Sequence, residues 1–78
     1  MPWAFCIRRE GETTPQVAHL FDEEAGALHY LQQQVLEYKQ NDYIVEPVAG
    51  EPNTFLITDP QRIGEANHHI WVEHRDPV

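Results

Sequence analysis

The chain has a single cysteine, Cys6, and no long hydrophobic run among its 78 residues. One cysteine cannot form an intramolecular disulfide, whereas a secreted domain of this size usually carries several. No stretch approaches the roughly 20 apolar residues that span a bilayer, and the first residues lack the basic segment and apolar run of a secretion signal. Together with a length that suits one domain, these absences predict a single domain, residues 1–78, in the cytoplasm.

Basic residues are also scarce. Five Lys and Arg stand against 13 Asp and Glu, which gives a formal net charge of −8 at pH 7 with neutral histidines. A field of this sign repels the phosphates of nucleic acids and of anionic membranes. We therefore expect no direct contact with nucleic acid or membrane, and we expect a protein partner with a basic surface.

Short motifs that carry catalytic chemistry are missing as well. The chain has no glycine-rich phosphate loop and no GxSxG element, and only four glycines to shape a pocket. A nucleophilic Cys6 would need a nearby base, and strand alternation places the nearest candidate, His19, on the opposite face of the sheet. The sequence therefore predicts a protein that is not an enzyme, with no catalytic residue and no cofactor.

What the sequence does contain is a series of strand patterns around one helix pattern. Apolar alternation or β-branched composition predicts strands at residues 3–10, 16–21, 43–48, 54–59 and 68–74. Asp22 is a candidate N-cap for a helix that runs to about Gln40. The apolar stripe of this helix is formed by Leu28, Leu31, Val35 and Tyr38 and is widened by Ala25 and Leu36. Asp59 and Pro60 resemble the start of a helical turn over residues 60–66.

This order predicts an α+β fold, a mostly antiparallel sheet of four to five strands with one long helix packed on one face. The alternation assigns the helix-facing side to Trp3, Phe5, Ile7, Val17, Phe21, Val45, Phe55, Ile57, Ile70 and Val72. The open side would carry Ala4, Cys6, Ala18, Leu20, Leu56 and Trp71. An exposed apolar patch of this kind is typical of a contact with another chain.

Three of the five histidines lie in the last predicted strand, at His68, His69 and His74. In a strand, His68 and His69 point to opposite faces, and His69 and Glu73 lie roughly 13 Å apart by strand rise. These side chains cannot share one coordination sphere, so the pattern predicts polar strand ends and no metal site.

The excess of carboxylates is the strongest functional feature. Acidic groups spread over a compact domain can imitate the phosphate field of a nucleic acid and bind a basic surface by attraction that salt weakens. Tryptophan often supplies the apolar anchor of an interface. We expect the partner-binding residues to be Asp22, Glu23, Glu24, Glu37, Asp42, Glu46, Trp71 and Glu73.

In size, acidity, lack of cysteine pairs and one-domain α+β plan, the whole chain resembles the small acidic anti-CRISPR proteins that phages use against type I surveillance complexes. This resemblance rests on overall character, because no residue string is diagnostic of those proteins. It implies that Asp22, Glu23 and Glu24 contact lysines and arginines in a DNA-binding groove of a surveillance complex subunit, with Trp71 as an anchor.

Two alternatives stay open at this point. The protein could act as a homodimeric accessory or regulatory protein, which associates through its open sheet face with Trp71 buried between subunits. A metal or thiol enzyme is the third class, and it requires bound zinc or a reactive Cys6.

Overall fold

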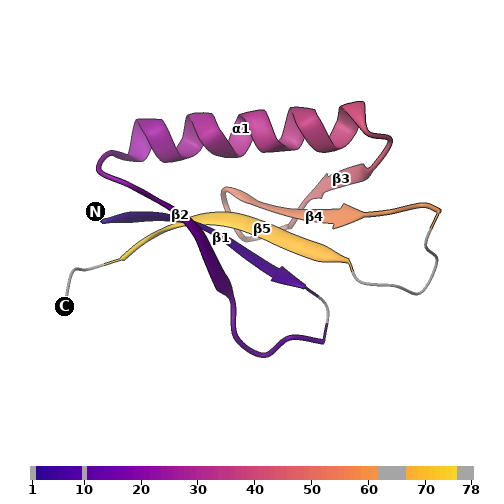
Figure 1. Ribbon diagram of the computed structural model, residues 1–78, viewed down its shortest axis with the longest axis horizontal. Helices are drawn as coiled ribbons and strands as arrows, with labels where there is room; N and C mark the ends of the chain where they lie inside the picture. The colour runs from indigo at the N-terminus through magenta and orange to yellow at the C-terminus, as the bar shows by residue number, and fades with distance from the viewer. Residues whose placement is uncertain (1, 10, 62–66, 76–78) are drawn as a thin grey trace.

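One helix lies across one face of a five-stranded sheet in the computed structural model, which describes residues 2–9, 11–61 and 67–75 (Figure 1). The predicted α+β fold is confirmed. The elements are β1 (Trp3–Arg9), β2 (Gln16–Phe21), α1 (Glu24–Gln40), β3 (Ile44–Pro47), β4 (Thr54–Thr58) and β5 (His68–His74). No helix within these ranges has both the length and the apolarity to span a bilayer.

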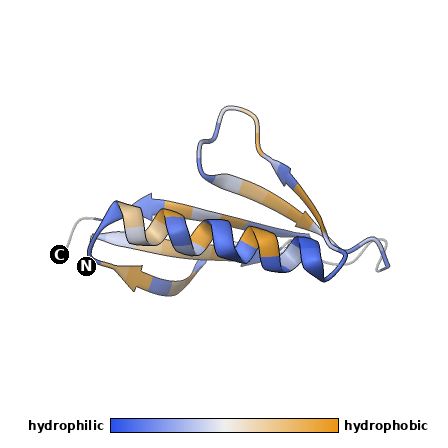
Figure 2. Cartoon of the chain, turned by 90° about the horizontal axis from the view of Figure 1, so that it is seen from above, coloured by the Kyte–Doolittle hydropathy of each residue, from blue (hydrophilic) through white to orange (hydrophobic). Residues whose placement is uncertain are grey.

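All neighbouring strands are antiparallel, in the order β2-β1-β5-β4-β3. The first and last strands of the chain therefore form the centre of the sheet. The two edges are β2 and the short β3, which ends at Pro47. Proline cannot donate a ladder hydrogen bond, so the end of an edge strand is a place that tolerates it. The turn between β3 and β4 projects away from the other strands (Figure 2).

The core lies between α1 and the sheet. Nine of the ten residues predicted for the helix-facing side are buried or partly buried there, together with Ala27, Leu31 and Val35 from the helix. The predicted stripe of α1 is too wide, however. Ala25 is exposed, and Leu36 is 58% exposed, because a single sheet below the helix covers a narrower arc than the one assumed.

Val17 is the tenth residue, and its predicted place is wrong. The β1–β2 register pairs Phe5 with His19 but Cys6 with Val17, so Ala18 is an extra residue on β2. Such a bulge moves the residues before it to the other face. Val17 therefore lies beside Cys6 on the face away from α1, whereas His19 and Phe21 keep their predicted side.

The start of α1 also differs from the prediction. Glu23 is the N-cap, in an extended conformation and without a side-chain capping hydrogen bond. Asp22 lies one residue before it in an exposed bend. The carboxylates that follow still favour the positive end of the helix dipole, with Glu24 in the first turn.

The end of α1 is closed by a Schellman motif. Tyr43 N–H donates to the Tyr38 carbonyl at 3.0 Å, and Asp42 N–H donates to the Lys39 carbonyl at 3.2 Å. Asp42 has a φ of 67°, the left-handed conformation that this motif requires. The rings of Tyr38 and Tyr43 then meet edge to face, 5.3 Å apart, as the apolar contact that accompanies the motif.

The predicted turn at residues 60–66 falls mostly outside the described ranges, which omit residues 62–66. At its start, the Asp59 carboxylate accepts a hydrogen bond from Gln61 N–H at 2.9 Å. This is the bond expected of an Asx turn.

Replacing Asp42 by glycine should stabilise the fold. A left-handed φ is unfavourable for a residue with a Cβ atom, so Asp42→Gly should raise the free energy of unfolding by about 1 kcal/mol. Urea denaturation monitored by circular dichroism measures this change. Asp42→Ala, which keeps the Cβ atom and removes the polar group that tolerates this conformation, should be less stable than the wild type. Equal stabilities of the two variants would contradict the role assigned to this residue.

Candidate functional site

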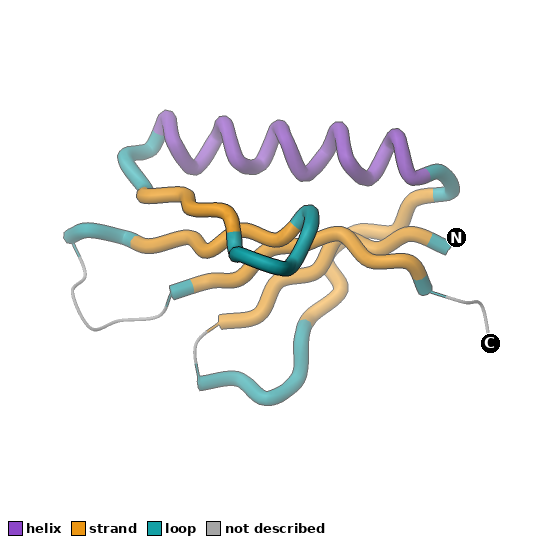
Figure 3. The backbone as a smooth tube through the Cα atoms, turned by 180° about the vertical axis from the view of Figure 1, so that it is seen from behind, coloured by secondary structure: helices purple, strands orange, loops and turns teal. Residues whose placement is uncertain are grey.

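The face of the sheet opposite α1 is not covered by another element in the part of the chain described (Figure 3). Ala4, Cys6, Leu20, Leu56 and Trp71 lie on it, as the strand alternation predicted. The expectation that all of them form a wet apolar patch is wrong, however, because Ala4 and Cys6 are 0% exposed.

Cross-strand neighbours explain how these two residues are buried without a second layer. Cys6 lies between Val17 on β2 and Trp71 on β5, and Ala4 lies between Leu20 and Glu73. Each small side chain is flanked on both sides by a larger one on the same face, which shields it from water. The accessible part of the patch is therefore formed by Leu20, which is 48% exposed, and by the partly exposed Leu56 and Trp71.

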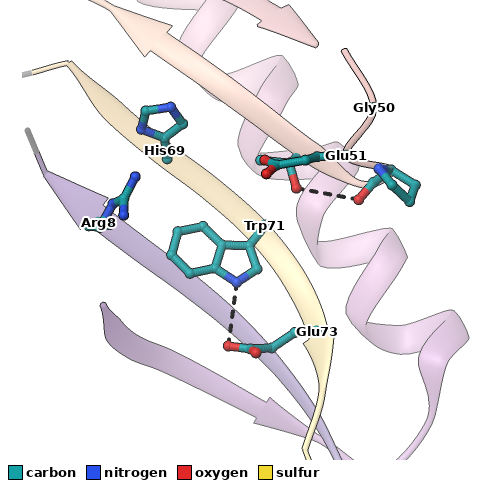
Figure 4. Close-up of a pocket in the computed structure, with 8 residues that line it drawn as sticks. Arg8, Gly50, Glu51, His69, Trp71 and Glu73 are labelled. Carbon is teal, nitrogen blue, oxygen red and sulfur yellow. Dashed lines mark hydrogen bonds between the residues drawn. The ribbon is translucent and has the colours of Figure 1, made fainter. Parts of the chain in front are cut away.

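One carboxylate oxygen organises the polar groups on this face. Glu73 Oε1 accepts hydrogen bonds from the Cys6 thiol at 3.0 Å and from Trp71 Nε1 at 3.4 Å (Figure 4). The Arg75 guanidinium also reaches this oxygen, with Nη2 at 3.3 Å. Glu73 thereby fixes the indole of Trp71 against the sheet.

These contacts favour the protonated form of the Cys6 thiol. Burial, the hydrogen bond to Glu73 and the negative charge of that carboxylate raise the pKa of the Cys6 thiol to about 12. The same hydrogen bond, with those from Arg75 and Trp71, lowers the pKa of Glu73. His19 faces α1, with its ring 4.8 Å from that of Tyr30, so it lies across the sheet from Cys6 as predicted. The raised pKa favours the protonated thiol, whereas the thiolate is the form that attacks.

Trp71 forms part of a groove of about 430 Å³ on the same face. Arg8 and His69 lie beside the indole on β1 and β5, and Glu51 approaches from the β3–β4 turn (Figure 4). The groove is open and carries both signs of charge. This geometry suits a protein side chain or a flat surface better than a small substrate that must be enclosed.

The histidines of β5 are arranged as predicted. His68 pairs with Arg9 and Ile57, whereas His69 pairs with Arg8 and Leu56, so the two imidazoles lie on opposite faces. Burial, followed by the charge of Arg9, lowers the pKa of His68. Across residues 2–9, 11–61 and 67–75, no group of three or more histidine, cysteine, aspartate and glutamate side chains is placed to hold a metal ion.

The other predicted partner-binding residues do not join Trp71 and Glu73. Asp22, Glu23 and Glu24 lie at the start of α1, Glu37 and Asp42 lie at its end about 25 Å away, and Glu46 lies on edge strand β3. All six are exposed. The structure thus brings together one predicted pair, Trp71 and Glu73, and distributes the other carboxylates over the helix layer and one sheet edge.

Sequence reasoning missed the roles of Cys6, Arg75 and Arg8 in this arrangement. The two-residue spacing of Trp71, Glu73 and Arg75 is a signal for one face of a strand, and it could have identified part of the cluster. The pairing of Cys6 with Trp71 depends on the register between the first and last strands, for which the sequence contains no local signal.

Comparison with known proteins gives no family. No protein-family model, curated protein or solved structure matches the chain. The assignment of function therefore depends on the chemistry of the surfaces described above.

The raised thiol pKa predicts a specific loss of stability in alkali. Below pH 9.0, the ordinary pKa of the thiol, both the folded and the unfolded chain keep the proton. Between that value and about 12 the unfolded chain loses it first, so the free energy of unfolding should fall with pH by up to about 1.4 kcal/mol per pH unit.

Urea denaturation of the wild type and of Cys6→Ala from pH 8 to pH 11 separates this effect from the titration of other groups. The variant should be less stable at pH 8 because it has a cavity, and the difference should narrow as the pH rises. A constant difference over this range would show that Cys6 does not retain its proton in the folded state.

Proposed function

We propose that this protein is a non-enzymatic binding protein that docks on a basic, nucleic-acid-binding surface of a larger complex and prevents DNA from binding there. A subunit of a type I CRISPR surveillance complex is the proposed target, and the host cytoplasm is the proposed place of action. In this proposal the chain acts as a DNA mimic encoded by a phage, as an anti-CRISPR inhibitor does.

The observation that carries this proposal is that the exposed carboxylates are not neutralised by neighbouring side chains. Asp22, Glu23, Glu24, Glu37, Asp42 and Glu46 have no ion pair within the described ranges, where the one ion pair joins Arg75 to Glu73. With a net charge of −8, such a surface attracts a cationic partner at long range. The partly exposed indole of Trp71 offers an apolar anchor on the face of the sheet opposite α1, which also carries the accessible Leu20 and Leu56.

The distribution of these carboxylates also limits the mode of binding. They lie at both ends of α1 and on edge strand β3, and the ends of the helix are about 25 Å apart. A partner that contacts both ends must therefore carry basic groups over a comparable length, as a DNA-binding channel does.

Charge reversal near the helix start tests the proposal. Glu23→Lys combined with Glu24→Lys should weaken binding to a purified type I surveillance complex by tenfold or more, because four units of charge change at the contact. Mobility shift of target DNA, measured with and without the protein at low and high salt, reports the inhibition.

Glu10→Lys combined with Glu12→Lys is the matched control, since it changes the net charge by the same amount at two nearby positions of the chain outside the proposed set. If the wild type does not reduce DNA binding by the complex at either salt concentration, the proposed target is wrong. If both double variants lose activity equally, net charge alone accounts for binding and the proposed contact residues are wrong.

A second candidate is a homodimeric accessory or regulatory protein that associates through the open sheet face, and the charge pattern of this face supports it. Arg8 and His69 form one cross-strand row, Cys6 and Trp71 form the next, and Ala4 and Glu73 form the third. Two copies stacked about a two-fold axis through the middle row would place the Arg8 row of one copy over Glu73 of the other.

Sedimentation velocity from low to high micromolar concentration distinguishes this candidate from the first. Trp71→Ala should raise the dissociation constant of such a dimer at least tenfold, since the indole would be buried at the centre of the interface. Leu36→Ala, on the opposite side of the molecule, should leave the equilibrium unchanged. A wild-type chain that stays monomeric at every concentration would exclude the homodimer.

A further inference from the structure

A second hollow lies at the C-terminal end of α1, away from the sheet face with Trp71. It has a volume of about 530 Å³ and is lined by Gln34, Glu37, Tyr38, Asn41 and Tyr43. Two aromatic rings, two amides and one carboxylate thus surround a space that belongs to no surface discussed above. Glu37 is one of the carboxylates assigned to partner binding, which links this hollow to the proposed function.

The aromatic walls of the hollow are held in place by the end of the helix. The Schellman motif turns the chain back so that Tyr43 N–H bonds to the Tyr38 carbonyl at 3.0 Å, and the rings meet at 5.3 Å with an interplanar angle of 84°. Burial raises the pKa of Tyr38, so its ring remains a neutral phenol. A perpendicular pair of neutral rings offers a π face to a cation without further ordering of either side chain.

The polar groups around these rings include several acceptors. Asn41 Nδ2 donates to the Glu37 carbonyl at 2.8 Å, which leaves the Asn41 side-chain oxygen to accept from a ligand. The Glu37 carboxylate is exposed and has no ion pair within the described part of the chain. The last carbonyls of α1 add the negative end of the helix dipole. The Asn41 oxygen, the Glu37 carboxylate and the helix end all favour a donor, and the carboxylate and the helix end favour one with positive charge.

The two ends of α1 differ in this respect. At the start, Glu24 lies in the first turn, where the positive end of the dipole already stabilises a carboxylate. At the other end, the Glu37 carboxylate and the end of the helix dipole are both negative, so each of them attracts a cation. The acidic residues of α1 are therefore unequal as contacts for a basic partner.

We propose that the hollow formed by Gln34, Glu37, Tyr38, Asn41 and Tyr43 binds the guanidinium group of an arginine side chain from a basic partner. The planar guanidinium stacks on a tyrosine ring while its N–H groups donate to the Glu37 carboxylate and the Asn41 amide oxygen. This inference rests on the proposed function, because it names the chemical group of the partner that one part of the acidic surface recognises.

Lys39 lies in the last turn of α1, and Arg9 is the cation whose charge acts on Tyr38. Its charge acts on Tyr38 in the direction that lowers the pKa of the phenol, against the larger effect of burial. Arg9 does not line the hollow, so its charge repels an incoming guanidinium while its side chain leaves the site free. Arg9→Gln should therefore tighten the binding of a cation here.

Titration of the full chain, labelled with ¹⁵N and with ¹³C in the tyrosine rings, tests the proposal by NMR. N-acetyl-argininamide should cause saturable shifts of the Tyr38 and Tyr43 ring signals and of the Gln34 and Asn41 side-chain amides. N-acetyl-citrullinamide, which has the same shape without the charge, should cause none. Glu37→Gln should weaken the affinity for argininamide about fivefold, and Glu24→Gln, the matched control at the other end of α1, should change it less than twofold.

Three results would overturn the proposal: no saturable shift at these four residues, equal shifts with the citrulline analogue, or an equal effect of Glu24→Gln. The salt-dependent inhibition assay on the surveillance complex is a separate measurement. If that assay succeeds while the titration fails, the acidic surface binds a basic partner without this hollow. If the titration succeeds while the assay fails, the hollow recognises arginine and the proposed target is wrong.

Discussion

The antiparallel pairing of β1 with β5 is the contact on which the rest of the molecule depends. It joins Trp3 to His74, so almost the whole chain is the loop that this pairing closes, at an entropic cost of roughly 4 kcal/mol. That cost is comparable to the net stability of a small domain. The buried residues Phe5, Ile70 and Val72, all on these two strands, offset it by removing apolar surface from water.

The same pairing determines the chemistry of the open face. Because β1 and β5 are adjacent and in this register, Cys6 lies beside Trp71 and two residues from the row of Glu73. A chain with one helix cannot cover both faces of its sheet, and this protein protects the second face by placing small residues between large ones. The thiol is consequently buried and hydrogen-bonded to a carboxylate, which favours the protonated form over the reactive thiolate.

Local patterns in the sequence predicted the elements and nine of the ten helix-facing residues, since strand alternation and helix periodicity depend only on neighbours along the chain. The face of Val17 was wrong because the extra residue Ala18 shifts the alternation by one, and a bulge leaves no mark in an apolar stretch. Strand order and the hydrogen bonds to Glu73 could not be predicted, because both require knowing that the first and last strands pair. Trp71 was identified from strand alternation, which places it on the open face, and Glu73 from the excess of carboxylates. The pairing of Tyr38 with Tyr43 was missed because it depends on the reversal of the chain at Asp42.

The energetics of α1 connect folding with function. Carboxylates at the start of a helix stabilise it, so Glu23 and Glu24 are accounted for by the helix itself. Glu37 lies in the last turns, where a negative charge opposes the dipole, and Asp42 carries a Cβ atom in a conformation that suits glycine better. The stability of the fold therefore does not account for a carboxylate at either position. A carboxylate at a position where it disfavours the helix, beside two fixed tyrosine rings and an amide acceptor, is the arrangement that the proposed arginine site requires.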